Sequence, residues 1–315
     1  MEKLKELQSE LSFKLKAIEE NLTELLGVTK YEEPETGNSG QTKGGLPSFL
    51  YATDETNQET LKSKIKELCN GEIELGFSIK RDGSSFTCYF KKDEQGNWYH
   101  GICSRNQEKK TEQYYITKYI DGHNNEYTKF LDPETKIMGY KNHELNHFLS
   151  EREILNTDWT PIKVEVKDSW VELANKSGLV EKGMEYCKQH DIQLAFRGEI
   201  YGQGLKGSGN KSNPDAGKKQ GLYLFGVDDL SSGFAVRLNQ SSKHNLIDLA
   251  TQFNMEYAKP IRKFPTSYEN FCEIAETIIA EEAKQGRIIE GVVVRTMNDN
   301  RLSTKYMNKV YDAKK

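Results

Sequence analysis

Short apolar runs that alternate with turns constrain the fold of this 315-residue chain more than any other feature. Such runs suit strands better than helices, because a strand crosses a packed core within about four to eight residues. The clearest predicted strands cover residues 86–90, 193–201, 222–227 and 288–295. Amphipathic spacing predicts two helices as well, at residues 169–190 and 268–285. This mixture predicts an α+β fold in which helices flank antiparallel sheets.

Residues 1–26 form a predicted amphipathic helix that precedes a larger domain over residues 27–315. Apolar side chains recur on one face of this helix at spacings of three and four, at Leu4, Leu7, Leu11, Leu15, Ile18, Leu22 and Leu25. The stripe either packs on the chain's own core or joins two copies of the chain in a coiled coil. Residues 30–47 contain four glycines and two prolines, which predicts a linker or an extended crossing segment.

The stretch at residues 107–165 is polar and has little clear period. We predict that it is an insertion, or a surface subdomain, within the larger domain. His143 and His147 in this stretch have the spacing of one helix face. Because no cysteine or carboxylate pattern of a zinc site surrounds them, we interpret the pair as part of a solvated helix face.

Composition narrows the class of protein. Charged residues make up 29% of the chain and apolar residues 36%, so the chain is too apolar for a disordered protein. A net charge of -4 excludes a globally basic coat for nucleic acid, while a local basic groove stays compatible with it. No run approaches the roughly 20 apolar residues of a membrane helix, so no membrane partner is expected.

Five cysteines are scattered along the chain, at Cys69, Cys88, Cys103, Cys187 and Cys272. None forms a C-x-x-C pair and the number is odd, so neither a disulfide framework nor a zinc ribbon is expected. This usage suits the cytoplasm or another reducing intracellular compartment.

A glycine-rich stretch at residues 202–207 matches G-x-G-x-x-G and follows a predicted strand. The dinucleotide-binding form of this motif requires a helix directly after it. The chain continues instead with serine, glycine, asparagine and proline, which predicts a flexible loop. Lysines in and after this loop would suit phosphate groups.

Ionisable residues lie at the ends of apolar strands or inside them. The set consists of Lys80, Asp82, Glu199, Glu290 and Lys305, and both glutamates are predicted to lie within strands. A charge in such a strand is costly to bury unless it is paired. Two lysines and two glutamates can pair with one another and with a metal ion, so this set predicts an active site.

Six short motifs follow one another along the chain: K-x-D-G at Lys80, S-R-N at Arg105, R-G-E-x-Y-G at Glu199, an aromatic strand at Phe225, E-G-V-V-V-R at Glu290 and S-x-K at Lys305. The ordered set resembles the covalent nucleotidyltransferase superfamily of polynucleotide ligases and mRNA capping enzymes. It is most similar to ATP-dependent RNA ligases of the Deinococcus type. Residues 25–34, 46–49 and 53–58 extend this resemblance upstream.

The resemblance implies four catalytic residues, Lys80, Glu199, Glu290 and Lys305. Lys80 would be the nucleophile that takes AMP from ATP and carries it as lysyl-AMP. Glu290 and Glu199 would bind Mg²⁺ or Mn²⁺, hard cations that prefer such oxygen ligands. Lys305 would hold the α-phosphate and stabilise its developing charge.

The resemblance also implies a nucleotide site made by Lys80, Asp82, Arg105, Glu199, Phe225 and Lys305. In that site Asp82 helps to order the lysine turn. Arg105 contacts phosphates of nucleotide and substrate, and Phe225 stacks on adenine. The expected fold is therefore a nucleotidyltransferase domain.

The implied activity is that of an ATP-dependent RNA ligase that joins 3′-hydroxyl and 5′-phosphate ends, with RNA or a nicked nucleic-acid duplex as partner. AMP passes from the lysine to the 5′-phosphate, and the 3′-hydroxyl then expels it. Two alternatives stay open: a DNA ligase or NAD-dependent ligase, and a non-catalytic nucleic-acid-binding protein with a ligase-like fold. Because the sequence continues for ten residues after Lys305, we expect no C-terminal OB domain.

Overall fold

The computed structural model of the protein describes residues 42–112, 115–132, 135, 137–155, 159–165, 167–205 and 213–312. The helix predicted over residues 1–26 lies outside this part of the chain. Most of the predicted linker over residues 30–47 lies outside it as well. The last part of that linker forms strand β1 (Thr42–Gly45), so the segment is extended where the structure describes it.

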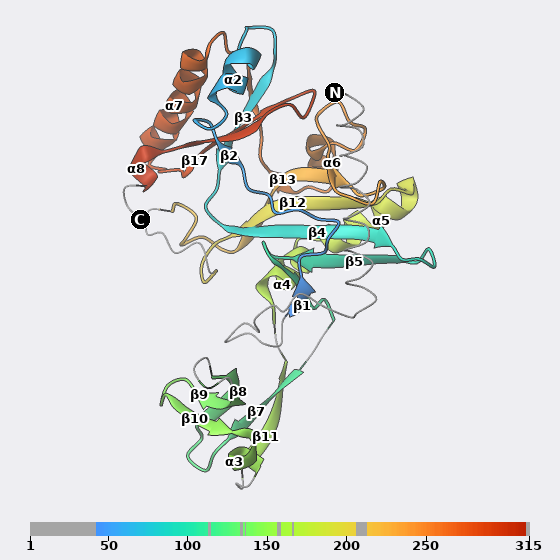
Figure 1. Cartoon of the computed structure of the whole chain (residues 1–315), viewed down its shortest axis with the longest axis vertical. Helices are drawn as coiled ribbons and strands as arrows, with labels where there is room; N and C mark the ends of the chain where they lie inside the picture. Colours follow the sequence, from blue (N-terminus) through green and yellow to red (C-terminus); the bar gives the residue numbers. More distant parts are fainter. Residues whose placement is uncertain are drawn as a thin grey trace, which may run out of the picture.

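The described residues form three sheets (Figure 1). The large sheet has the strand order β1-β6-β5-β4-β12-β13-β14, and β15 pairs with β13. Its other strands are β4 (Ser84–Lys92), β5 (Trp98–Cys103), β6 (Gln107–Lys109), β12 (Leu194–Tyr201), β13 (Gly221–Asp229), β14 (Val236–Arg237) and β15 (Glu256–Tyr257). Strands β4, β12 and β13 confirm three of the predicted apolar strands.

A second sheet of five strands has the order β16-β3-β17-β18-β2. Its strands are β2 (Thr56–Asn57), β3 (Leu75–Lys80), β16 (Ile261–Lys263), β17 (Gly291–Thr296) and β18 (Ser303–Met307). Helices α2 (Lys62–Leu68) and α7 (Tyr268–Lys284) pack on this sheet through a core that includes Ile65, Phe77 and Phe271. Helix α7 confirms the helix predicted at residues 268–285.

The helix predicted over residues 169–190 is in fact two helices, α4 (Ser169–Lys176) and α5 (Leu179–His190). Gly178 separates them with a φ of 75°, a left-handed conformation that glycine adopts without steric cost. The prediction of one helix was wrong because the amphipathic spacing continues across this break. Together with α6 (Leu246–Gln252), these helices pack on the large sheet through its main apolar core.

Residues 115–165 form the third sheet, which lies apart from the other two in Figure 1. Its order is β10-β9-β8-β7-β11, and the elements are β7 (Tyr115–Ile120), β8 (Glu126–Leu131), β9 (Met138–Asn142), β10 (His147–Ser150), α3 (Glu151–Leu155) and β11 (Thr160–Glu165). Residues 107–109, placed in the predicted insertion, belong instead to β6 of the large sheet.

His143 and His147 do not share a helix face, and that prediction was wrong. His143 lies in the turn between β9 and β10, and His147 begins β10. Asn146 has a φ of 49°, and the Asn142 side chain accepts a hydrogen bond from the backbone N–H of Leu145. Asparagine favours both features, so the local sequence closes a hairpin here.

No helix among the described residues is both long enough and apolar enough to cross a membrane. The five cysteines are free thiols, four of them buried.

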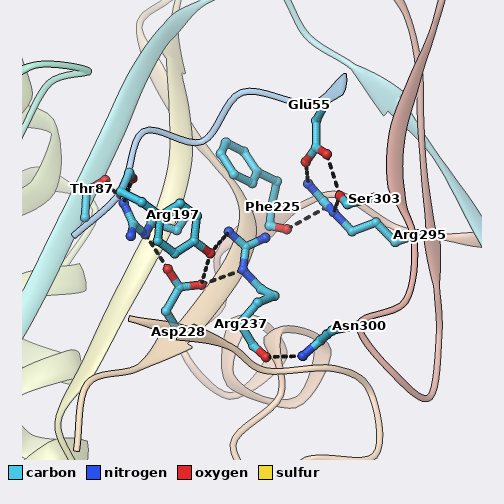
Figure 2. Close-up of polar contacts among 10 residues, drawn as sticks. Glu55, Thr87, Arg197, Phe225, Asp228, Arg237, Arg295, Asn300 and Ser303 are labelled. Carbon is cyan, nitrogen blue, oxygen red and sulfur yellow. Dashed lines mark hydrogen bonds and ion pairs between the residues drawn. The ribbon is translucent and has the colours of Figure 1, made fainter. Parts of the chain in front are cut away.

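Residues 46–57, which we call the crossing segment, run from the large sheet to the second sheet. At one end the segment follows β1, and at the other end β2 pairs with β18. A buried ion-pair network holds its middle in place (Figure 2): Arg197 and Arg237 donate to Asp228 at 2.7 and 2.5 Å, and Arg197 also donates to the backbone oxygen of Tyr51 at 3.1 Å. The side chains of Arg197 and Asp228 are only 1% and 0% exposed.

We expect Asp228→Asn to lower the free energy of unfolding by about 3 kcal/mol or more, because it leaves the buried Arg197 guanidinium without its counter-charge. Urea unfolding followed by circular dichroism measures the change. Glu172→Gln is the matched control, since it breaks an ion pair with Lys176 at the surface and should cost less than about 1 kcal/mol. Equal losses in the two variants would contradict the importance of the buried network.

Candidate active site

The predicted nucleophile lies where the chain passes from one sheet to the other. Lys80 is the last residue of β3 in the second sheet, and Ser84 is the first residue of β4 in the large sheet. Residues 81–83 make the turn between them. A Cβ atom on Gly83 would lie 2.6 Å from the backbone oxygen of Ile200, so only glycine fits this close approach.

A cavity of about 540 Å³ opens beside this turn, between the two sheets. All seven predicted site residues line it: Lys80, Asp82, Arg105, Glu199, Phe225, Glu290 and Lys305. They come from four strands and three connecting segments that are far apart in the sequence. The structure thus brings together every residue of the predicted constellation.

Lys80 forms a close ion pair inside the cavity. Its Nζ donates to Oε2 of Glu290 at 2.6 Å, and the two side chains are 23% and 10% exposed. Glu290 does not lie inside a strand as predicted, because it directly precedes β17, whose pairing with β18 begins at Gly291. The bend at this position turns the carboxylate toward the lysine.

Lys305 shares a sheet face with Lys80. It lies opposite Val293 on β17, and Val293 lies opposite Ser78 on β3. Alternate residues of a strand point to the same face, so Lys80, two residues beyond Ser78, has the same orientation. The register therefore places two cationic side chains on the cavity side of the second sheet.

Glu199 carries a buried carboxylate oxygen in the site. It lies within β12, as predicted, and its Oε2 is buried without a hydrogen-bond partner among the described residues. Burial raises the pKa of Glu199 to about 8; Lys80 opposes this shift, and the carboxylates of Glu290 and Asp82 reinforce it. An unpaired buried oxygen of this kind is suited to a cationic ligand.

The donor set fits one hard divalent cation. No group of three or more His, Cys, Asp or Glu side chains that could hold a metal occurs in the described ranges. Magnesium is typically bound through one or two carboxylates, with water and substrate phosphates as its other ligands. Glu199 and Glu290 match that pattern. The buried Glu199 oxygen, which has no hydrogen-bond partner among the described residues, also favours a bound cation.

Phe225 lies on β13 and lines the cavity, and Arg295 contacts it (Figure 2). The Arg295 Nη1 donates to the backbone oxygen of Phe225 at 3.1 Å, and its guanidinium carbon lies 5.6 Å from the ring centroid. Arg295 and Ser303 both donate to the carboxylate of Glu55. Although burial opposes it, Arg295 holds the pKa of Glu55 below its ordinary value.

Arg105 lies at the rim of the cavity, paired with Asp54 of the crossing segment. Both side chains are 60% exposed. An ion pair this exposed adds little stability, so Arg105 can exchange Asp54 for a phosphate group at small cost.

Sequence reasoning missed Arg81, the neighbour of the predicted nucleophile. Its guanidinium lies between the rings of Tyr201 and Tyr223, 4.3 and 4.4 Å from their centroids. It also pairs with Glu256 at 2.5 Å and with Asp215 at 3.7 Å. Nothing in the local sequence distinguishes Arg81 from a surface charge, because its partners lie more than 100 residues away.

Glu55 and Arg295 were likewise given no role, although both fall inside quoted motifs. The arginine ends the E-G-V-V-V-R run, and the glutamate lies in the stretch before β2. A buried pairing between them depends on the parallel contact of β2 with β18. Their presence in the motifs was the only available signal.

The glycine-rich stretch after β12 begins as a turn rather than a helix, with left-handed φ values of 114° and 80° at Gly202 and Gly204. Residues 206–212 lie outside the described part. The loop interpretation therefore agrees with the part that the structure describes.

Comparison with known proteins gives a match in structure only. No family model matches the chain, and no curated protein matches it. A lysine-to-alanine variant of Naegleria gruberi RNA ligase without ligand matches with a TM-score of 0.55 at 21% identity, over 93% of this chain and 66% of that one.

Two further structures of Naegleria gruberi RNA ligase give the same match. A lysine-to-alanine variant with ATP and Mn has a TM-score of 0.55 at 21% identity, over 93% of this chain and 67% of that one. A lysine-to-methionine variant with AMP and Mn has a TM-score of 0.54 at 20% identity, over the same shares. The chain therefore has this RNA ligase fold, and it spans about two thirds of the length of those proteins.

Glu199 should make the metal-free protein less stable as the pH rises. Its raised pKa means that the folded protein keeps a proton that the unfolded chain releases, so stability falls from below pH 5 up to about pH 8. We expect Glu199→Gln to flatten this decline and to stabilise the protein at pH 8 by more than about 1 kcal/mol. Urea unfolding between pH 5 and 9 with EDTA measures it.

Glu94→Gln, at an exposed position, is the control and should leave the pH profile unchanged. A Glu199→Gln profile that coincides with the wild-type profile would show that Glu199 is ionised in the folded protein.

Proposed function

We propose that this chain is an ATP-dependent RNA ligase that seals 3′-hydroxyl and 5′-phosphate ends, chiefly at nicks, through a lysyl-AMP intermediate. One observation carries the proposal: Lys80 pairs with Glu290 in a cavity that Glu199, Lys305 and Phe225 also line. The fold agrees, since it is that of an RNA ligase whose solved structures contain ATP or AMP with Mn. The motif order further resembles Deinococcus-type ligases.

In the first step, Lys80 Nζ attacks the α-phosphorus of ATP. A nitrogen–phosphorus bond forms, the bond from the α-phosphorus to the bridging oxygen breaks, and pyrophosphate leaves. The amine must give up a proton to attack, and the Glu290 carboxylate at 2.6 Å is within reach to orient the amine and to accept that proton. Lys305 neutralises charge that develops on the α-phosphate.

Glu199 and Glu290 would hold Mg²⁺ or Mn²⁺, which supplies charge neutralisation at the phosphate oxygens. Phe225, which lines the cavity, offers an aromatic face to the adenine, and Arg295 keeps the β13 backbone in place there. Asp82 keeps the turn that aims Lys80 into the cavity.

In the next two steps the nucleic-acid ends react. An oxygen of the 5′-phosphate attacks the lysyl-AMP phosphorus, the nitrogen–phosphorus bond breaks, and Lys80 is restored. The 3′-hydroxyl then attacks the activated 5′-phosphate and expels AMP. Arg105 at the exposed rim is placed to receive the incoming phosphate, because its contact with Asp54 is easily exchanged.

Lys80→Ala should abolish covalent labelling by AMP. We expect the wild-type mass to rise by roughly 329 Da with ATP and magnesium, the mass of one transferred AMP in covalent catalysis. Intact-mass measurement after incubation with ATP, NAD or GTP checks both the residue and the donor. Lys92→Ala, at the end of β4 where its lysine pairs with Asp191, is the control and should label normally.

Labelling that persists in Lys80→Ala would remove the central claim. Labelling of the wild type by NAD in place of ATP would instead indicate an NAD-dependent ligase. A folded wild type that takes no adduct from any nucleotide would favour a non-catalytic binding protein.

Glu290→Ala should lose metal-dependent sealing of nicked RNA by about 100-fold or more, because it removes both a metal ligand and the partner of Lys80. Steady-state sealing measured across a magnesium titration checks this, with parallel assays on nicked DNA to establish the preferred substrate. Unchanged magnesium dependence in the variant would refute a metal-binding role for Glu290.

A further inference from the structure

A buried tyrosine holds the aspartate of the lysine turn. The Tyr311 hydroxyl donates to Oδ2 of Asp82 at 2.5 Å, and Tyr311 is 0% exposed. Tyr311 belongs to the short helix α8 (Lys309–Asp312), which follows β18. On the other side, Asn213 Nδ2 donates to the backbone oxygen of Asp82 at 2.7 Å. The turn is thus fixed by residues from outside every predicted motif.

Asn308, which directly precedes this short helix, contacts the backbone at Glu290, the second acidic residue of the site. The backbone N–H of Asn308 donates to the backbone oxygen of Glu290 at 2.9 Å, and its Nδ2 donates to the backbone oxygen of Ile289 at 2.9 Å. Its Oδ1 also accepts from the N–H of Val310 at 3.1 Å, which ties these contacts to α8. Asn308 is 7% exposed, so its hydrogen bonds are shielded from water.

We propose that residues 308–311 form a positioning element for the active site, in which Tyr311 orients the Asp82 carboxylate and Asn308 holds the backbone from which the Glu290 side chain projects. The inference rests on the proposed function. Both acidic residues face the cavity that holds Lys80. A carboxylate with one oxygen fixed by a buried hydroxyl cannot rotate freely, so its other oxygen keeps a constant direction toward the cavity. Such outer contacts tune the affinity and geometry of a metal site.

Tyr311→Phe tests this element with little disturbance, because the buried ring stays and only the hydroxyl is removed. Tyr306→Phe is a close control: its hydroxyl also donates to a carboxylate at 2.5 Å, that of Glu276, and the residue is 7% exposed. Neither Tyr306 nor Glu276 lines the cavity. Both variants lose the same kind of bond, and only Tyr311→Phe loses it at the active site.

Two measurements separate positioning from stability. At saturating ATP, we expect Tyr311→Phe to slow lysyl-AMP formation about 10-fold and to raise the half-saturating magnesium concentration, with the KM for ATP nearly unchanged. By calorimetry, the gain in affinity for a non-cleavable ATP analogue when Mn²⁺ is added should be several-fold smaller than in the wild type. Tyr306→Phe should match the wild type in both.

A double variant shows whether Tyr311 acts through Asp82. If it does, Tyr311→Phe should add no further loss to Asp82→Asn, because the two residues then form one unit. Additive losses, or equal behaviour of Tyr311→Phe and Tyr306→Phe, would overturn the positioning role while leaving the ligase proposal intact. If the wild type takes no AMP, the ligase proposal fails, and the calorimetric coupling still decides whether Tyr311 positions the site.

Discussion

The active site depends on charged side chains that are buried between two sheets. The turn at residues 81–83 joins the sheets, so the lysine that precedes it must lie between them. A lysine in that position needs a counter-charge, and Glu290 supplies it at 2.6 Å. Glu199 then lies close to a pair that is already neutral, and its buried oxygen has no partner in the described residues. The site is therefore arranged around a carboxylate that a cation or a proton must satisfy, and such perturbed carboxylates cluster at functional sites.

Support for the cavity comes from segments distant in sequence. The crossing segment leaves the large sheet, passes the Arg197–Asp228 pair and ends beside β18. It carries Asp54 to the rim and Glu55 to Arg295. Arg295 also donates to the backbone oxygen of Phe225. This one arginine therefore links the cavity wall at Phe225 to the crossing segment. The Arg197–Asp228 pair thus holds the middle of the crossing segment, and the Glu55–Arg295 pair holds its end against the wall of the cavity.

The turn that carries Lys80 is held from both sides as well. Arg81 lies between two tyrosine rings on the large sheet, while Asp82 contacts Tyr311 from the end of the described chain. These contacts give neighbouring side chains different surroundings: Lys80 pairs with Glu290, and the Arg81 guanidinium is held by the two tyrosine rings and Glu256. Such rigid placement limits the motion of Lys80; in the proposed phosphoryl transfer, positioning of this kind contributes to catalysis together with charge stabilisation.

The sequence by itself determined the apolar strands, helix α7 and which charged residues lie in or beside apolar strands. Strand period and charge placement are local properties of the chain. It also indicated that Lys80, Glu199, Glu290 and Lys305 belong together, since charges in apolar strands need partners. It did not reveal the break at Gly178 or the hairpin around Asn146, where one residue's left-handed φ overrides an otherwise helical spacing. The sequence did not predict the partners of Arg81, Glu55 and Asp82. Those contacts join residues 120 to 248 positions apart, and only the packing of two sheets against each other brings them together.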